Sequence, residues 1–243
     1  TDTLQILGDT SCIAYYKMSD ATDESGNYDA SVQLGNFNVA GKFGNAVSFD
    51  GVLNSGMITG QNWGRTNDFG ISVWVKDLDT GTAGYQYKVL VQNYKDDYIP
   101  FNYDTTNKLF EFPLHDGTTL LKTLQTASNI DTSYWRHLVL TQKMTGTGAG
   151  VFLYLDGSLA DSYVGAVTQR RAISSASYTS TTIAKSQGGQ ANLALEGKID
   201  QVRLFDKFIS STEVTTLNDE VYCVPTIVPT AHFNTVIYTG NGG

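Results

Sequence analysis

Short apolar runs separated by polar turn residues fill most of the chain. Segments such as "CIAYYKM", "GISVWVK", "WRHLVLTQ" and "GKIDQVRLF" hold about 5 to 9 residues rich in β-branched and aromatic side chains, each closed by Gly, Asn, Asp or Ser. Aliphatic and aromatic or polar positions alternate, so that Ile71, Val73 and Val75 share one face of a strand and Trp74 lies on the other. The pattern predicts an all-β sandwich of two antiparallel sheets, with the aliphatic faces packed between them and the aromatic and polar faces directed outward or into a groove.

One segment departs from the strand pattern. In "SSTEVTTLNDE", Ser210 or Ser211 can cap a helix, and Glu213 is spaced to complete a capping box. Val214 and Leu217 form a small apolar face. These features predict one short helix near the C-terminal end of the chain, at about residues 210–219.

A hairpin is predicted at "VFLYLDGSLA". Asp156-Gly157 is the dipeptide that most strongly favours a two-residue hairpin turn. Before the turn, Leu153 falls on the aliphatic face of the strand and Tyr154 on the opposite face.

The length of 243 residues is sufficient for one β-sandwich domain. We assign residues 1–222 to this sandwich domain. Pro225 and Pro229 interrupt regular structure, so residues 223–243 are interpreted as a linker and the start of a further strand or domain. The strand-like "HFNTVIYTG" lacks partner strands in this sequence, which predicts that residues 226–243 pair with a neighbouring subunit or belong to a further domain.

The charge of the chain excludes several partners. The formal net charge is −8, which repels phosphate backbones and anionic lipid surfaces, so nucleic acid is not expected as a partner. No run approaches the roughly 18 apolar residues of a membrane span, and membrane insertion is not expected. The start "TDTLQILGDT" lacks the features of a signal peptide, so either the chain is not secreted by that route or the signal has been removed.

Two cysteines lie near opposite ends of the chain. We interpret Cys12 and Cys223 as small, buried hydrophobic residues. A disulfide between them is the alternative in an oxidising medium.

Catalytic patterns are missing from the sequence. No E-x-D-x-E or E-x-D-x-x-E run provides the paired carboxylates of a glycosidase, and Glu111 and Glu196 each stand outside such a pattern. The three histidines form neither a close pair nor an HExxH motif, and His137 in "WRHLVLT" is interpreted as a structural strand residue. We therefore expect a protein that is not an enzyme.

The order of the motifs resembles a known family. From about Ser11 to Glu220, "CIAYYKMSDATDESGNYDASV", "GKFGNAVSFDG", "FGISVWVK", "WRHLVLTQ", "VFLYLDGSLADS" and "GKIDQVRLFDKFISSTEVTTL" resemble the laminin G-like and pentraxin-like branch of the concanavalin A-like lectin/glucanase superfamily. The resemblance implies a jelly roll of two antiparallel sheets, one of them curved, in which the first and last strands are adjacent.

The resemblance also implies a structural calcium ion. In this superfamily an aspartate of the last strand often helps to hold calcium, and Asp200 matches it in position. Calcium takes six to eight oxygen ligands. The further ligands offered by the sequence are Asp23, Ser25, Asn27, Asp50 and Gly51. The alternative is that Asp200 caps a turn or pairs with Arg203 or a lysine.

Two non-catalytic functions fit these observations. A lectin would stack a sugar ring on outward aromatic side chains while Asn and Asp side chains bind its hydroxyls. The expected ligand-binding residues are Trp74, Tyr85, Tyr87, Tyr98 and Tyr154. A structural or decoration module would use the same surfaces to pack on its neighbours.

The two ends of the chain resemble segments of large structural proteins of tailed bacteriophages. This resemblance rests on "GDTSCIAYYKMSD…DESGNYDA" and on "HFNTVIYTGNGG". It implies a virion surface protein, such as a tail fibre, appendage or capsid decoration, that acts in adhesion or particle decoration. The partners expected are other virion proteins or copies of the chain in an oligomer, and a host-surface glycan. A cellular or secreted, extracellular carbohydrate-binding module is the alternative.

Overall fold

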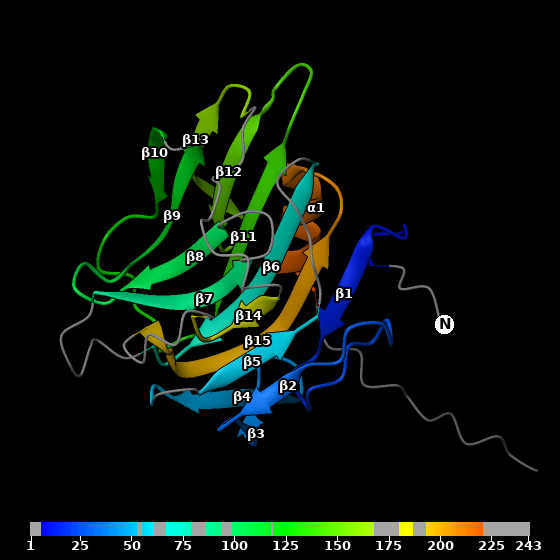
Figure 1. Cartoon of the computed structure of the whole chain (residues 1–243), viewed down its shortest axis with the longest axis vertical. Coiled ribbons are helices and arrows are strands. Elements are labelled where there is room, and N and C mark those ends of the chain that lie inside the picture. The colour runs from blue at the N-terminus through cyan, green and yellow to red at the C-terminus, as the bar shows by residue number, and fades with distance from the viewer. Residues whose placement is uncertain are drawn as a thin grey trace, which may run out of the picture.

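The protein is a two-layered β-sandwich. The structure is a computed structural model that describes residues 6–52, 55–60, 67–78, 86–93, 99–117, 119–167, 180–186 and 193–220. These residues form two antiparallel sheets and one α-helix (Figure 1). The predicted fold class is confirmed.

The larger sheet has eight strands. In order across the sheet they are β13 (Ser158–Val164), β12 (Gly150–Leu155), β11 (Arg136–Lys143), β6 (Phe69–Lys76), β15 (Glu196–Phe205), β4 (Asn45–Asp50) and β3 (Asn36–Ala40), with β1 (Cys12–Tyr16) also paired to β15. Because β1 and β15 pair, the first and last described strands are neighbours, as the predicted jelly roll requires.

The smaller sheet has seven strands. In order they are β10 (Thr119–Gln125), β9 (Leu109–Asp116), β8 (Ile99–Asp104), β7 (Tyr87–Asn93), β14 (Thr181–Ile183), β5 (Gly56–Thr59) and β2 (Ser31–Gln33). Strands β7 to β10 form a meander, whereas β14 comes from a distant part of the sequence and inserts between β7 and β5.

Aliphatic and aromatic side chains from both sheets fill the space between the layers. Ile71 and Val73 of β6 and Leu153 of β12 are fully buried in one cluster with Phe101 and Phe112 of the smaller sheet. Burial of each such side chain stabilises the fold by about 1.5 to 3 kcal/mol. The alternation in the sequence therefore identified the core face of these strands correctly.

The predicted hairpin joins β12 to β13. Asp156 has φ 48° and Gly157 has φ 79°, so both central residues of the turn have left-handed backbone conformations. A two-residue turn of this kind matches the right-handed twist of the strands that it joins.

Strand β15 changes partner along one edge, and a bulge marks the change. Ile199 pairs with β4, whereas Val202 pairs with β1. Along the other edge, the register with β6 shifts between Asp200 and Arg203, and Gln201 between them has φ 51°. Because a bulge bends a strand and increases its local twist, one strand can serve both partners.

Helix α1 (Ser211–Asn218) covers part of the outer face of the eight-stranded sheet. Ser210 is the N-cap, and both hydrogen bonds of the capping box with Glu213 are present. Val214 and Leu217 are buried against the sheet. The short helix and its cap are thus confirmed.

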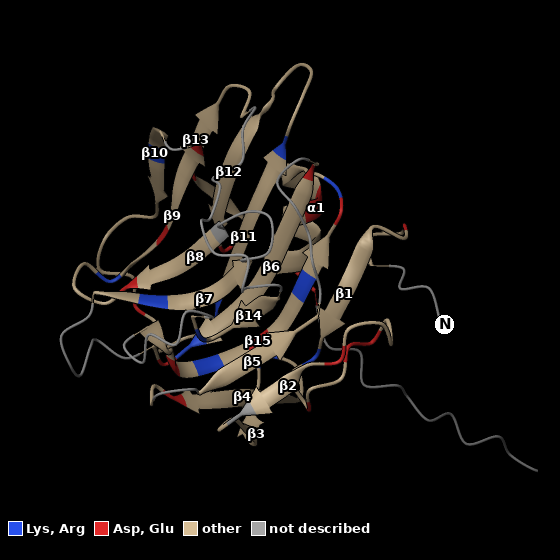
Figure 2. Ribbon diagram, viewed as in Figure 1, with Lys and Arg blue, Asp and Glu red and all other residues tan. Residues whose placement is uncertain are grey.

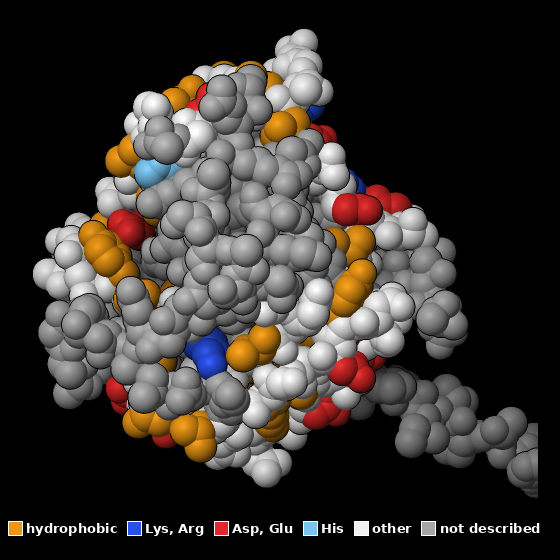
Figure 3. Space-filling model, viewed as in Figure 1, with side chains coloured by type: hydrophobic (Ala, Val, Ile, Leu, Met, Phe, Trp, Pro, Cys, Tyr) orange, Lys and Arg blue, Asp and Glu red, His pale blue; other side chains and the backbone are white. Residues whose placement is uncertain are grey.

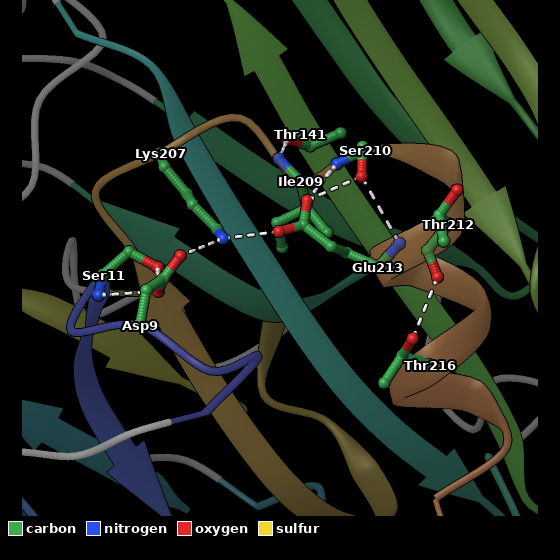
Figure 4. A network of polar contacts seen from close by, with 9 residues as sticks. All are labelled: Asp9, Ser11, Thr141, Lys207, Ile209, Ser210, Thr212, Glu213 and Thr216. Carbon is green, nitrogen blue, oxygen red and sulfur yellow. Dashed lines mark hydrogen bonds and ion pairs between the residues drawn. The ribbon is translucent and has the colours of Figure 1, made fainter.

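A polar network attaches the start of α1 to the N-terminal segment (Figure 4). Lys207 Nζ forms ion pairs with Asp9 Oδ2 and Glu213 Oε1, each at 2.5 Å. Ile209 N donates to Thr141 Oγ1 of β11 at 2.8 Å. Hydrogen bonding to Lys207 lowers the pKa of Asp9 to about 2, with a further contribution from Ser11. The network joins three segments that are distant in sequence: residues 9–11, β11 and the start of α1.

The ends of the chain are described in part. Cys12 is a buried free thiol, and burial raises its pKa to about 12. Cys223 and the predicted linker at residues 223–243 lie outside the described residues. In the part of the chain that the structure describes, no helix has the length and apolar character needed to cross a membrane.

Candidate functional site

Trp74 is expected to offer its ring to a ligand on the outward face of β6. The structure places it on that face but leaves only 4% of the residue exposed. Phe43 meets it edge-on at 5.8 Å between ring centroids, His137 stacks on it at 4.7 Å, and Lys42 Nζ lies 4.5 Å from the ring centroid. The expected exposure is wrong, because the turn between β3 and β4 covers Trp74.

Tyr154 is also covered. It lies in a buried cluster with Val139 and with Val214 and Leu217 of α1. Burial raises the pKa of its hydroxyl. The expectation of an exposed Tyr154 is wrong for the same physical reason: the outer face of this sheet has a second layer, formed here by the helix.

The remaining aromatic candidates differ in position. Tyr85 and Tyr98 lie outside the described residues. Tyr87 is the first residue of β7 and is 39% exposed. Its role as a ligand-binding residue stays a prediction.

Asp200 organises the turn that covers Trp74. Its Oδ2 accepts a hydrogen bond from the backbone N–H of Phe43 at 3.0 Å. Burial raises the pKa of Asp200 to about 6, although backbone hydrogen bonds from Phe43 and Lys42 oppose the rise. A Cβ on Gly41 would lie 2.6 Å from Oδ2, so the turn approaches the carboxylate closely. Asp200 therefore caps a turn, which is one of the alternatives left open by the sequence.

His137 lies in β11, as predicted, and is 1% exposed. Its Nε2 lies 2.9 Å from Ser72 Oγ. Burial lowers the pKa of His137 to about 3, and the positive charges of Arg203 and Lys42 contribute to the shift. The imidazole is therefore neutral at physiological pH and acts in packing.

Asp23, the second expected calcium ligand, organises its own loop. Its Oδ1 accepts from Tyr15 N at 2.8 Å and from Ser25 N at 3.1 Å, and its Oδ2 accepts from Tyr28 N at 3.2 Å and from Ser25 Oγ. Asn27 is exposed and donates to Ser25 Oγ. Both oxygens of Asp23 are thus already engaged by the protein.

The expected calcium ligands do not converge on one site. Asp50, followed by Gly51, lies opposite Glu196 at the start of β15, and Asp200 is four residues farther along that strand, roughly 13 Å at the usual rise. Among the residues that the structure describes, no group of three His, Cys, Asp or Glu side chains could hold a metal ion. The donor set does not fit one calcium ion, and calcium binding stays a prediction that melting curves with and without a chelator can test.

A polar row crosses the outer face of the seven-stranded sheet. Gln125 of β10 lies opposite Glu111 of β9, and Glu111 lies opposite Asn102 of β8. Beyond Asn102 the row ends at Val89 of β7. Phe110, next to Glu111, points into the core, so alternation directs these side chains outward. We call Gln125, Glu111 and Asn102 the polar row.

Glu111 is the one acidic residue of the polar row. Its Oε2 accepts a hydrogen bond from Gln125 Nε2 at 3.2 Å. Burial raises the pKa of Glu111, and the Gln125 hydrogen bond opposes this rise. Burial also raises the pKa of Tyr87, as do the nearby carboxylates of Glu111 and Asp104. Tyr87 is thus electrostatically coupled to the polar row.

Asp104 anchors the turn at one end of this face. It lies opposite Tyr87, and its carboxylate accepts from Gln86 Nε2 at 2.7 Å, Thr106 N at 2.8 Å and Asn107 N at 3.0 Å. Burial acts to raise the pKa of Asp104, but these hydrogen bonds outweigh it and the pKa is lowered. Asp104 therefore stays ionised and holds the turn between β8 and β9.

The outer face of the seven-stranded sheet faces the viewer in Figure 1, where α1 lies behind β6. Lys and Arg residues occur singly on several strands (Figure 2). Hydrophobic, acidic and other polar side chains are interspersed around the margin of this view (Figure 3).

Sequence reasoning considered Glu111 only as a catalytic candidate and did not single out Asn102 or Gln125. The alternation in "PFNYDTTNKLFEF" already places Asn102 and Glu111 opposite the core side of their strands. Glu196 starts β15 in the other sheet, so Glu111 and Glu196 do not form a glycosidase pair. His115 lies in β9, and His232 is outside the described residues.

The family follows from comparison with known proteins. Residues 48–215 match the family model described as the concanavalin A-like lectin/glucanases superfamily, and the chain belongs to this superfamily. No curated protein sequence matches the chain.

Solved structures share the fold at low sequence identity. Domain 4 of AbnA, a GH43 extracellular arabinanase from Geobacillus stearothermophilus, in complex with arabinotriose, has a TM-score of 0.60 at 17% identity, with 86% of this chain and 98% of that chain covered. The binding domain of Paraclostridial Mosquitocidal Protein 1 has a TM-score of 0.60 at 20% identity, with 86% and 51% covered.

The binding domain of botulinum neurotoxin DC in complex with SialylT has a TM-score of 0.59 at 14% identity, with 86% of this chain and 51% of that chain covered. This chain thus spans about half the length of the toxin structures that it matches. A Trypanosoma rangeli sialidase has a TM-score of 0.58 at 17% identity, with 86% and 33% covered. The fold is thus shared by one part of each of these enzyme chains as well as by toxin binding domains.

Proposed function

We propose that the chain is a non-enzymatic carbohydrate-binding module whose ligand lies on the outer face of the seven-stranded sheet. The exposed side chains of Gln125 and Tyr87 on this face carry this proposal. The Gln125 amide offers a donor and an acceptor to sugar hydroxyls and is held by its hydrogen bond to Glu111, whereas Glu111 and Asn102 themselves are only 6% and 8% exposed. Tyr87 lies on the same face, partly exposed, where its ring can stack on a sugar.

The fold neighbours support this choice of ligand. The arabinanase domain is described with arabinotriose and the neurotoxin binding domain with SialylT. We therefore propose a glycan as the ligand class of this chain. The separation of Glu111 and Glu196 into different sheets, together with the absence of a glycosidase motif in the sequence, favours binding over hydrolysis.

The finer proposal is that this module belongs to a virion surface protein, such as a tail fibre, appendage or capsid decoration. Its support is the resemblance of the two ends of the sequence to structural proteins of tailed bacteriophages. The partners would be other virion proteins or further copies of the chain, and the glycan would lie on the host surface. A cellular or secreted carbohydrate-binding module is the alternative, and the mass of the full polypeptide in purified particles separates the two.

The binding site can be tested with two exposed tyrosines. We expect Tyr87→Ala to weaken glycan binding by a factor of about 2 to 12, because a lost stacking contact is worth about 0.5 to 1.5 kcal/mol. Tyr134→Ala is the matched control, since Tyr134 is 68% exposed and precedes β11 of the other sheet. Equal affinity of both variants and the unchanged protein in calorimetry would place the ligand elsewhere.

A further inference from the structure

The turn between β3 and β4 covers Asp200 and Trp74 together. Gly41 N donates to Gly44 O at 2.9 Å, which closes the turn, and Gly44 has φ 73°, a conformation that glycine adopts without strain. Asp200 and Trp74 are opposite each other on β15 and β6 and are 0% and 4% exposed. Lys42 in the turn is exposed, so the turn separates the two buried side chains from solvent.

The turn is anchored by the groups that it covers. Phe43 N donates to Asp200 Oδ2 at 3.0 Å, and the ring of Phe43 meets Trp74 edge-on. Lys42 Nζ lies 4.5 Å from the centre of the Trp74 ring. The backbone pairs of β3 with β4 lie before and after the turn, so these contacts can break without loss of the sheet.

Both covered side chains contain a buried polar atom without a partner. Asp200 Oδ1 and Trp74 Nε1 form no hydrogen bond with the residues that the structure describes. A buried donor or acceptor that has lost its water and gained no partner destabilises the closed turn. Opening of the turn admits water to both atoms. The gain is largest when Asp200 is ionised, because an unpaired buried charge is far less favourable than an unpaired neutral group.

No cation compensates an ionised Asp200. In the described part of the chain, no basic side chain forms an ion pair with it. The nearest basic residues on the same strand are engaged elsewhere, Arg203 with Glu220 and Lys198 with Asp77, each at 2.7 Å. The other charged or titratable groups around it, from the turn and from strands β6, β11 and β1, are Lys42, Lys76, His137 and Tyr15.

Asp200 is the group that titrates beneath the turn. Burial raises its pKa to about 6, although backbone N–H groups of Phe43 and Lys42 donate to it. Burial lowers the pKa of His137 to about 3, so this ring stays neutral, and burial raises the pKa of Tyr15. Lys and Arg side chains ordinarily titrate at about 10 or above. Because the closed turn favours the neutral acid, ionisation of Asp200 shifts the turn toward an open state.

We propose that the turn of residues 41–44 is a pH-sensitive lid, closed over Trp74 in acid and opened by ionisation of Asp200 toward neutral pH. Opening exposes the rings of Trp74 and Phe43 on the outer face of the eight-stranded sheet. This face is opposite to the proposed glycan site, and the lid does not depend on that function. The lid adds apolar surface to the face at neutral pH and withdraws it in acid.

Hydrogen exchange followed by nuclear magnetic resonance on the full chain tests the lid. The reporters are the Phe43 amide and the Trp74 indole N–H. The amide of Leu140, which lies on β11 between β6 and β12, reports global unfolding. Asp200→Asn removes the charge and keeps an acceptor for Phe43 N. Asp206→Asn is the matched control, because Asp206 directly follows β15 and is exposed.

We expect the protection of both reporters, corrected for intrinsic exchange rates, to fall about tenfold between pH 5 and pH 8. This ratio follows from a pKa of about 4 in the open state and about 6 in the closed state. Protection of both reporters should stay below that of Leu140, because the lid opens without global unfolding. Asp200→Asn should show constant protection, and Asp206→Asn should behave as the unchanged protein.

Three outcomes overturn the proposal. Constant protection in the unchanged protein shows that opening is not linked to ionisation. A tenfold fall that persists in Asp200→Asn assigns the effect to another group. Protection of both reporters equal to that of Leu140 at every pH means that they exchange by global unfolding, and the turn is then a fixed part of the fold. None of these results bears on glycan binding.

Discussion

At the residue scale, Asp200 shows how burial sets the energetics of a carboxylate. Its folded-state pKa of about 6 lies above the ordinary value, so the folded protein holds this proton more tightly than the unfolded chain. The resulting stabilisation is present in full below the unfolded pKa, near about 4, and is lost as the pH rises through about 6. Ionised Asp200 therefore lowers the free energy of unfolding at neutral pH.

We expect the free energy of unfolding of Asp200→Asn to rise relative to that of the unchanged protein between pH 4 and pH 7, by up to about 3 kcal/mol. His137 acts in the opposite sense, since its lowered pKa makes the fold less stable in acid, but both proteins contain it and its effect cancels. Urea unfolding at several pH values measures the difference. A difference that does not change with pH would show that Asp200 titrates normally.

A substitution at Gly41 tests the close contact between the Asp200 carboxylate and the turn by adding a methyl group between them. A Cβ at Gly41 would lie 2.6 Å from Asp200 Oδ2 and 2.9 Å from the Asn45 backbone carbonyl carbon, so Gly41→Ala should destabilise the fold by about 1 to 3 kcal/mol. Gly60→Ala is the control, because nothing lies within 4 Å of a Cβ there. Equal melting temperatures of the two variants would contradict the close packing of the turn on Asp200.

At the element scale, the outer layer over the eight-stranded sheet depends on a properly formed α1. Ser210→Ala removes the side chain that accepts from Glu213 N and should lower the free energy of unfolding by about 0.5 to 2 kcal/mol. Ser211→Ala, one residue inside the helix, should have a small effect. Chemical denaturation compares the pair, and a loss at Ser211 as large as that at Ser210 would argue against this cap.

Elements were predictable from the sequence where the signal is local. The capping residues of α1 and the Asp156-Gly157 turn each lie within a few residues of what they control. The burial of Trp74 and Tyr154 was not predictable, because alternation specifies which face of a strand a residue occupies and not what packs over that face.

At the scale of the whole molecule, the fold was predictable from the order of its motifs and the site was not. The residues of the polar row become neighbours through the register of β8, β9 and β10, which are consecutive strands. No pattern within one strand specifies which residues of the next strand lie opposite it. The sequence therefore predicted the core and the ends of elements better than the arrangement of side chains across the sheet surface.

The C-terminal segment carries the prediction about assembly. Residues 1–222 retain Glu220, which pairs with Arg203 at 2.7 Å, so this fragment keeps the contact that fixes the chain after α1. We expect the fragment to sediment as a smaller oligomer or a monomer, with fewer subunits than the full chain, because residues 226–243 are predicted to pair with a neighbouring subunit. Identical sedimentation of the two would remove the role of this segment in assembly.

The central claim is that a glycan binds the outer face of the seven-stranded sheet. Nuclear magnetic resonance tests it most directly, by mapping backbone amide shifts as a glycan that binds is titrated into the full chain. The account predicts perturbed amides on β7 to β10 and β14, around Asn102 and Glu111. Perturbations concentrated on β1, β15 and α1 would contradict it, because they would place the ligand on the opposite face of the sandwich.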